Sequence, residues 1–163
     1  MSADFFGMTT LAASGVTEAD PTGAAALHRT KVLEMTQAAE DAVLAPSGAG
    51  AWSADIRAAL ATRIATLNGE TALAERYAAR IGDDSAAALA DPANDGSAQN
   101  MSAAVAFMDK VAARTRDVKA EDIETLKAAG IDDADIVRLA ELNAFLAYQI
   151  RLVAGLKLMR GAA

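Results

Sequence analysis

The side chains able to do chemistry in this chain are few, because its 163 residues include no cysteine and a single histidine, His28. Without a thiol there can be no disulfide, thiolate zinc site, iron–sulfur cluster or thiol nucleophile. One imidazole also excludes a two-histidine metal site within the chain and most hydrolase triads. We expect His28 to be exposed or hydrogen-bonded rather than catalytic. Chemistry therefore falls to carboxylates, tyrosines and arginines.

The charge balance argues against two classes of partner. The chain has 22 acidic and 15 basic residues and a formal net charge of −7, which repels nucleic-acid backbones and anionic membranes. The longest apolar stretch, Leu139 to Met159, is interrupted by Glu141, Arg151 and Lys157, which predicts a buried helix rather than a membrane-spanning one. The first residues have no basic region followed by a long apolar core. We therefore expect a cytoplasmic protein that binds neither nucleic acid nor membrane.

The composition favours an all-α fold. Alanine is abundant and aromatic residues make up 4% of the chain, a balance that suits helices better than strands. Residues 1–23 mix glycine and proline with isolated apolar residues, which predicts an arm, either a frayed terminus or a segment that docks through Phe5 and Phe6. Residues 24–163 are expected to form a single all-helical domain.

Local signals place the first helices. Thr22 can cap a helix from Gly23 to about Ala45. Its expected buried stripe consists of Val32, Met35, Ala39 and Val43. Ser53 is expected to cap a second helix that continues through Asn68 and Gly69 to about Ile81.

The C-terminal third predicts a short helix closed by Gly130, followed by a long helix from Asp133 to Met159. Asp132, Asp133 and Asp135 favour the start of that helix through its dipole, and this interpretation is preferred over a metal site. The long helix is apolar over more than one face, so it is expected to lie in the core or at a subunit interface.

Two segments carry a family resemblance. One is RAALATRIATLNGETALAERYA, residues 57–78, and the other is AEDIETLKAAGIDDADIVRLAELNAFLAYQIRLVAGL, residues 120–156. Together they resemble the alkylhydroperoxidase-D-like, or carboxymuconolactone decarboxylase-like, superfamily, in which an alanine-rich helix leads into Asn-Gly-Cys-x-x-Cys and a following histidine. The resemblance implies a bundle of about six to seven helices that is usually oligomeric.

The departures from that motif are informative. Its cysteine positions fall on Glu70 and Leu73, its histidine on Tyr77 and its upstream carboxylate on Ala58. In the thiol members these groups relay a proton and produce a thiolate, so we predict no thiol peroxidase activity. The decarboxylase branch is associated with a histidine where Tyr77 stands, so the resemblance does not predict that activity either.

The cavity that the resemblance implies makes Glu70 and Tyr77 the candidate catalytic pair, with Leu73 on the same helical face. A desolvated Glu70 could act as general acid or base, with the Tyr77 hydroxyl as donor. In the alternative, Glu70 pairs with Arg63 or Arg76 at the surface.

Asn143 and Arg151 are two further candidate binding residues, both expected on the buried face of the long helix. A buried arginine needs a partner, for which Glu141 or a carboxylate of another helix is the candidate.

Two hypotheses of function result. In the first, the chain is a non-redox helical oligomeric scaffold or partner subunit, assembling as dimers or multiples of dimers or with a thiol-bearing relative. In the second, it is a cofactor-free enzyme acting on a small organic acid, lactone or hydroperoxide through Glu70 and Tyr77. Neither hypothesis includes a metal or a cofactor.

Overall fold

The computed structural model describes residues 5–161, and its regular elements are all helical. This confirms the predicted all-α class. The described part contains more, shorter helices than the expected six to seven, because turns divide two of the expected long ones. The α-helices are α2 (Thr9–Ser14), α3 (Pro21–Leu27), α4 (Thr30–Leu44), α5 (Ala54–Leu67), α6 (Thr71–Ala78), α7 (Asp84–Ala87), α8 (Ser102–Ala113), α9 (Ala120–Ala128) and α10 (Asp133–Gly161). Short 3-10 turns cover Ala88–Ala90, Ser97–Gln99 and Thr115–Asp117.

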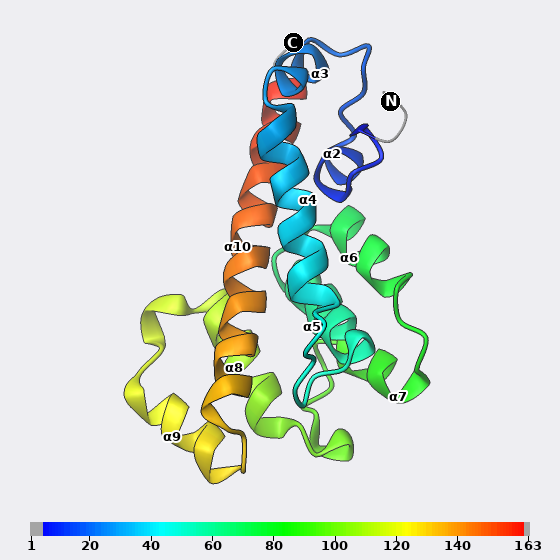
Figure 1. Ribbon diagram of the computed structural model, residues 1–163. Helices are drawn as coiled ribbons and strands as arrows, with labels where there is room; N and C mark the ends of the chain where they lie inside the picture. The colour runs from blue at the N-terminus through cyan, green and yellow to red at the C-terminus, as the bar shows by residue number, and fades with distance from the viewer. Residues whose placement is uncertain (1–4, 162–163) are drawn as a thin grey trace.

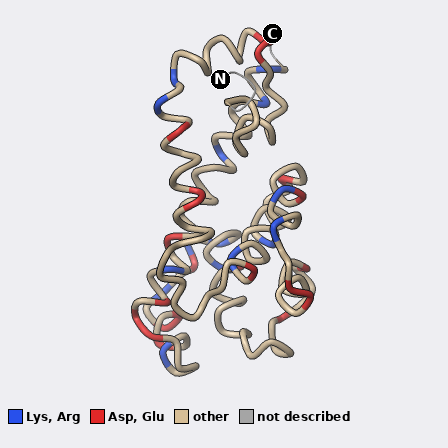
Figure 2. The backbone as a smooth tube through the Cα atoms, turned by 45° about the vertical axis from the view of Figure 1, so that its right-hand side comes forward, with Lys and Arg blue, Asp and Glu red and all other residues tan. Residues whose placement is uncertain are grey.

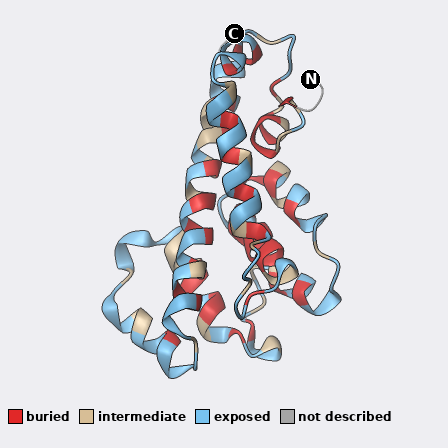
Figure 3. Cartoon of the chain, in the orientation of Figure 1, coloured by how far each residue is buried: buried red, intermediate tan, exposed pale blue. Residues whose placement is uncertain are grey.

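The 29-residue helix α10 is the axis of the molecule, and α4 runs beside it (Figure 1). Helices α2 and α3 lie against the C-terminal half of α10 and the N-terminal part of α4, while α5, α8 and α9 gather at the other end. Buried positions on α4 and α10 face inward, and α9 is mostly exposed (Figure 3). The fold therefore holds most of its core around α5, α8 and α10, with a smaller second core under α2.

The expected helix from Gly23 to Ala45 is divided in two, since α3 ends at Leu27 and α4 begins at Thr30. The predicted buried stripe is also displaced by one position, although its last member, Val43, is partly buried and packs against the main core. The buried residues of α4 are Leu33, Thr36, Glu40 and Leu44, each directly after the expected Val32, Met35, Ala39 and Val43. Met35 is 63% exposed. The buried face of α4 contains a threonine and a glutamate. Because a search for apolar spacing passes over polar residues, it selected the adjacent positions instead.

Helix α5 begins as predicted but ends early. The Ser53 hydroxyl accepts a hydrogen bond from the Ile56 backbone N–H at 3.2 Å. The helix then ends at Leu67 instead of continuing through Gly69, whose φ of +73° is the left-handed conformation that glycine adopts without strain. The Asn68 side chain donates to the Ile64 carbonyl at 2.9 Å, which satisfies one of the last carbonyls of the helix. The prediction of a continuous helix is wrong, and Glu70 stands at the start of α6.

The N-terminal segment is folded against its own chain from residue 5 onward. No helical period was expected there, yet α2 forms, and Leu11 is fully buried beside Val16 and Leu156. Phe5 is buried in the same cluster and meets Phe6 edge-to-face, with ring centroids 5.0 Å apart. The Phe5 ring therefore belongs to the core of this chain.

The start of α10 agrees with the sequence expectations. Gly130 ends α9 at a φ of +83°, and Asp132 accepts a hydrogen bond from the Asp135 backbone N–H at 2.7 Å. Asp135 in turn accepts from the Ala51 N–H and from Arg138. Within residues 5–161 no group of three or more histidine, cysteine or acidic residues is arranged to hold a metal ion. None of the described helices has the length and apolar character needed to cross a bilayer.

Candidate functional site

A buried polar network occupies the junction of α2, α4, α6 and α10. At its centre is Glu40, which is 1% exposed. Its Oε1 accepts a hydrogen bond from the Thr9 hydroxyl at 2.7 Å and pairs with Arg80 at 3.2 Å, while Oε2 accepts from the Gln149 amide at 2.6 Å. The Glu40 carboxylate is therefore paired with one cation, Arg80, and accepts hydrogen bonds from two neutral donors.

Tyr77 extends the network from the buried face of α6. The side chain is fully buried, and its hydroxyl donates to the Gln149 Oε1. Burial, followed by the negative charge of Glu40, raises the pKa of Tyr77 well above its ordinary value of 10.0. The hydroxyl is thus a fixed donor at neutral pH, and the Gln149 amide also reaches the Thr10 hydroxyl at 3.3 Å.

An open pocket of about 310 Å³ lies above this network. The pocket is lined by Thr9, Glu40, Arg76, Tyr77, Ala79 and Arg80. Arg76 in the last turn of α6 and Arg80 just beyond its end are both exposed, whereas Glu40 and Tyr77 form the buried floor. The arrangement offers guanidinium groups to a ligand, because both oxygens of Glu40 are already engaged by Thr9, Arg80 and Gln149.

The structure separates Glu70 from Tyr77, although both are buried. Glu70 is 9% exposed and pairs with Lys157 of α10 at 2.5 Å, not with Arg63 or Arg76 as expected. It is not among the residues that line the pocket around Tyr77. Leu73, between them in sequence, is fully buried in the main core. The Lys157 partner was missed because it lies 87 residues away in the sequence.

Asn143 and Arg151 both line a small cavity of about 80 Å³, together with Asn68. Asn143 is buried, and its amide donates to the Met108 carbonyl at 3.0 Å. Arg151 is exposed instead of buried, and its Nη1 donates to the Ala147 carbonyl one turn earlier at 3.1 Å. The expected ion pair between Arg151 and a carboxylate is not found in the described residues.

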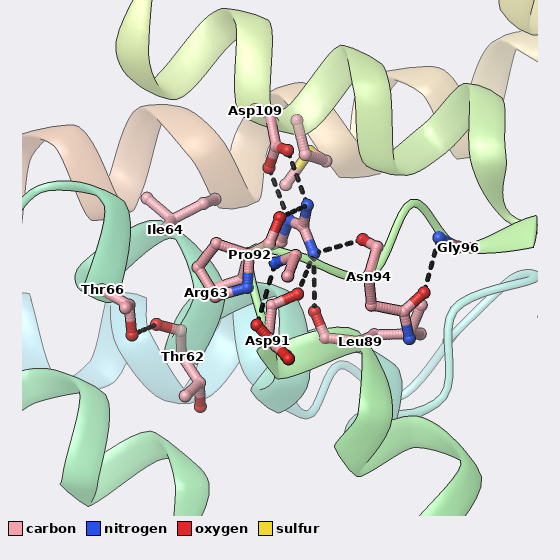
Figure 4. A network of polar contacts seen from close by, with 12 residues as sticks. Thr62, Arg63, Ile64, Thr66, Leu89, Asp91, Pro92, Asn94, Gly96 and Asp109 are labelled. Carbon is pink, nitrogen blue, oxygen red and sulfur yellow. Dashed lines mark hydrogen bonds and ion pairs between the residues drawn. The ribbon is translucent and has the colours of Figure 1, made fainter.

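A second polar centre is structural in character. Arg63 is 1% exposed and forms an ion pair with Asp109, with Nε and Nη2 at 2.6 and 2.7 Å from the two carboxylate oxygens (Figure 4). Its remaining donors reach four backbone carbonyls of the loop that follows α7, at 2.6–3.2 Å; these belong to Leu89, Asp91, Pro92 and Asn94. Arg63 thus uses its whole guanidinium to hold α5, α8 and this loop together.

Arg57 does the same for the turn between α4 and α5. It donates to the carbonyls of Trp52, Val43 and Ala49 at 2.8–3.1 Å. Burial, followed by repulsion from Arg138, lowers the pKa of Arg57 from its ordinary value. Both arginines are occupied by the fold itself and leave no guanidinium for a ligand.

Sequence reasoning missed three residues of this site: Glu40 in the pocket floor, Arg80 in its exposed wall, and Gln149, which is hydrogen-bonded to Glu40 and Tyr77 behind the floor. Gln149 carried a usable signal, because it is a polar residue between apolar neighbours on the long helix. Glu40 carried none, since glutamate on an amphipathic helix is normally solvent-exposed. His28 is exposed at the end of α3, in agreement with expectation.

Comparisons of this chain with protein-family models, with curated proteins and with solved structures find no match.

Proposed function

We propose that this chain is a non-redox helical scaffold that assembles with a second copy of itself through the face formed by α3, α4 and the C-terminal half of α10. The observation that carries the proposal is the concentration of exposed apolar side chains on this face. Of the eight large apolar residues exposed in the described part of the chain, six lie on α3, α4 and the C-terminal half of α10. They are Leu27, Val32, Met35, Tyr148, Leu158 and Met159. Single exposed apolar residues are ordinary, but several gathered on neighbouring helices support an interaction surface.

A groove gives this face a shape that a second copy can fit. The groove has a volume of about 310 Å³ and lies between the α3–α4 segment and α10, where Val32, Leu33, Leu152 and Leu156 line it. Arg29 is the only charged residue in its lining. Met35, one turn along α4 from Val32, is 63% exposed beside the groove. A two-fold interface uses the same patch on both copies, so a protruding methionine and an apolar groove on one face suit it.

The distribution of charge does not favour a nucleic-acid partner over a second protein chain. Acidic and basic residues are interspersed along the described chain, with no extended basic run of the kind that nucleic-acid binders use (Figure 2). The association surface is therefore expected to be chiefly apolar, and to tolerate salt better than an ion-paired one.

The enzyme alternative has less support. It depends on Glu70 acting together with Tyr77, and Glu70 is held by Lys157 outside the pocket that Tyr77 lines. A carboxylate engaged in an ion pair on one side of the fold is a structural bridge. The absence of cysteine from the sequence leaves the prediction of no thiol peroxidase activity in place, to be checked by dithiol-dependent turnover of an alkyl hydroperoxide against a heat-killed control.

The experiment is a mass measurement by light scattering over micromolar concentrations. The chain mass is 16.7 kDa, and we expect about twice this value or an even multiple of it. Met35→Glu and Met159→Glu should shift the mass toward one chain, because each places a charge inside the interface. Val137→Glu is the matched control, since Val137 is 54% exposed near the opposite end of α10. A wild-type mass of one chain, or equal dissociation by Val137→Glu, would overturn the proposal.

A further inference from the structure

We infer that the pocket between α2, α4 and α6 binds a small monocarboxylate, which Arg76 and Arg80 hold above the Glu40–Tyr77 floor. This site is on a different surface from the proposed association face, so each can be tested without the other. None of the pocket residues lines the apolar groove.

The two arginines have donors to spare. The Arg80 Nη1 pairs with Glu40 at 3.2 Å, and the Arg76 Nη2 donates to the Gly7 carbonyl at 3.0 Å. These are the hydrogen bonds and ion pairs of the two guanidinium groups within the described residues, and each guanidinium carries five N–H donors. Arg76 is on the last turn of α6, Arg80 lies two residues beyond its end, and both line the same pocket. Paired guanidinium groups at the mouth of a pocket match the planar oxygens of a carboxylate.

The net charge of the pocket lining favours a ligand with one negative charge. Its lining contains two arginines and one carboxylate, a local balance of one positive charge in a chain whose formal net charge is −7. Glu40 is 1% exposed at the floor, whereas the Arg80 side chain is 37% exposed. A ligand entering from solvent therefore meets the guanidinium groups before the carboxylate. A dianion such as phosphate brings a second negative charge toward Glu40, so a monocarboxylate fits better.

The floor is rigid before any ligand arrives. Five side chains from three helices and the α2 segment are joined by hydrogen bonds, and no buried side-chain polar atom in the described residues lacks a partner. An apolar cluster of the same volume would stabilise the fold at least as well as a buried charged network. The presence of a charged network, instead of an apolar cluster, under an open pocket therefore points to a binding role for the network.

The size and remaining lining of the pocket restrict the ligand. A volume of about 310 Å³ is at the low end for ligand pockets. Tyr77 and Ala79 supply the uncharged part of the wall. This suits an acid with a short apolar body, and propionate and butyrate are suitable probes.

The test is titration calorimetry of the full chain with sodium propionate and sodium butyrate, with sodium chloride and inorganic phosphate at equal ionic strength as comparison arms. We expect saturable binding of the carboxylates to the wild type. Arg76→Gln should weaken it by at least about tenfold, which is what the loss of one charge-assisted contact implies. Arg116→Gln is the matched control, because Arg116 is exposed in the turn after α8 and its loss changes the net charge equally. It should bind like the wild type.

Arg80→Gln is the second variant, and circular dichroism checks its fold, since Arg80 also balances Glu40. Arg76→Gln decides the matter if Arg80→Gln does not fold, because the Arg76 side chain hydrogen-bonds only to the Gly7 carbonyl within the described residues. The inference would be overturned by the absence of saturable carboxylate binding, by unchanged binding in Arg76→Gln, or by tighter binding of phosphate than of either carboxylate. Equal heats from chloride would show a nonspecific salt effect and would also overturn it.

Discussion

Replacing Arg63 with methionine tests whether a single buried side chain holds α5, α8 and the loop after α7 together. The substitution keeps a long side chain but removes six hydrogen bonds at 2.6–3.2 Å, two to Asp109 and four to backbone carbonyls between residues 89 and 94. Counting each of these charge-assisted bonds at about 1.5–3 kcal/mol would give a total as large as the whole free energy of unfolding of a typical domain, about 5–15 kcal/mol. Such sums are not additive, and the Asp109 side chain is 31% exposed, so water can solvate it in the variant.

We therefore expect Arg63→Met to lower the free energy of unfolding by about 3–5 kcal/mol, the cost of breaking one buried ion pair. Urea denaturation should show a fall in the free energy of unfolding of that size, which is a midpoint shift of about 2 M if the slope is about 2 kcal/mol/M. Amide hydrogen exchange should accelerate first in the loop from Leu89 to Asn94. Arg116→Met, an exposed arginine, is the control and should change stability by less than about 0.5 kcal/mol.

A loss below about 1 kcal/mol in Arg63→Met would refute the reasoning, since it would mean that the four carbonyls of the loop are satisfied equally well by water. Arg63→Lys refines the test. Lysine keeps the charge but has three donors in place of five and no planar fork, so it should recover only part of the loss.

Two further predictions concern the sequence-selected residues. Glu70→Gln should cost about 1 kcal/mol or less in urea denaturation, because the Lys157 side chain is 40% exposed and solvent screens the pair; a loss above about 3 kcal/mol would show that the bridge is effectively buried. Tyr77→Phe tests the raised pKa of Tyr77. The free energy of unfolding of the wild type minus that of the variant should be constant below about pH 10 and then fall by about 1.4 kcal/mol per pH unit. It falls because above about pH 10 the tyrosine ionises in the unfolded chain but stays neutral in the folded one. Parallel stability curves from pH 8 to 11.5 would contradict this.

Local signals in the sequence were sufficient for the helical class and for several helix ends. Ser53 caps α5, Gly130 closes α9 and Asp132 caps the start of α10. These features depend on residues within about one turn of each other, so the chain carries their signals without a partner. Gly69 shows the limit of this reasoning, because glycine is compatible with a helix interior as well as with the left-handed turn that forms.

Tertiary structure alone decided which face of α4 is buried. The apolar pattern selected Met35 and its stripe, but the face one position further is inside, and it carries Glu40. A glutamate can occupy that face only because Thr9, Arg80 and Gln149, which come from other elements, meet its carboxylate. Partners 31, 40 and 109 residues away in the chain have no spacing that a sequence pattern can display.

Distant partners also explain why the sequence could not place the residues of the candidate sites. The sequence by itself determined that thiol chemistry is absent and that the chain folds into helices. It could not determine that Glu70 meets Lys157, that Arg151 stays exposed, or that Arg76 and Arg80 line a pocket above Glu40. Burial, pairing and pocket shape arise from the docking of helices, and a charged side chain takes its role from the group that packing places opposite it.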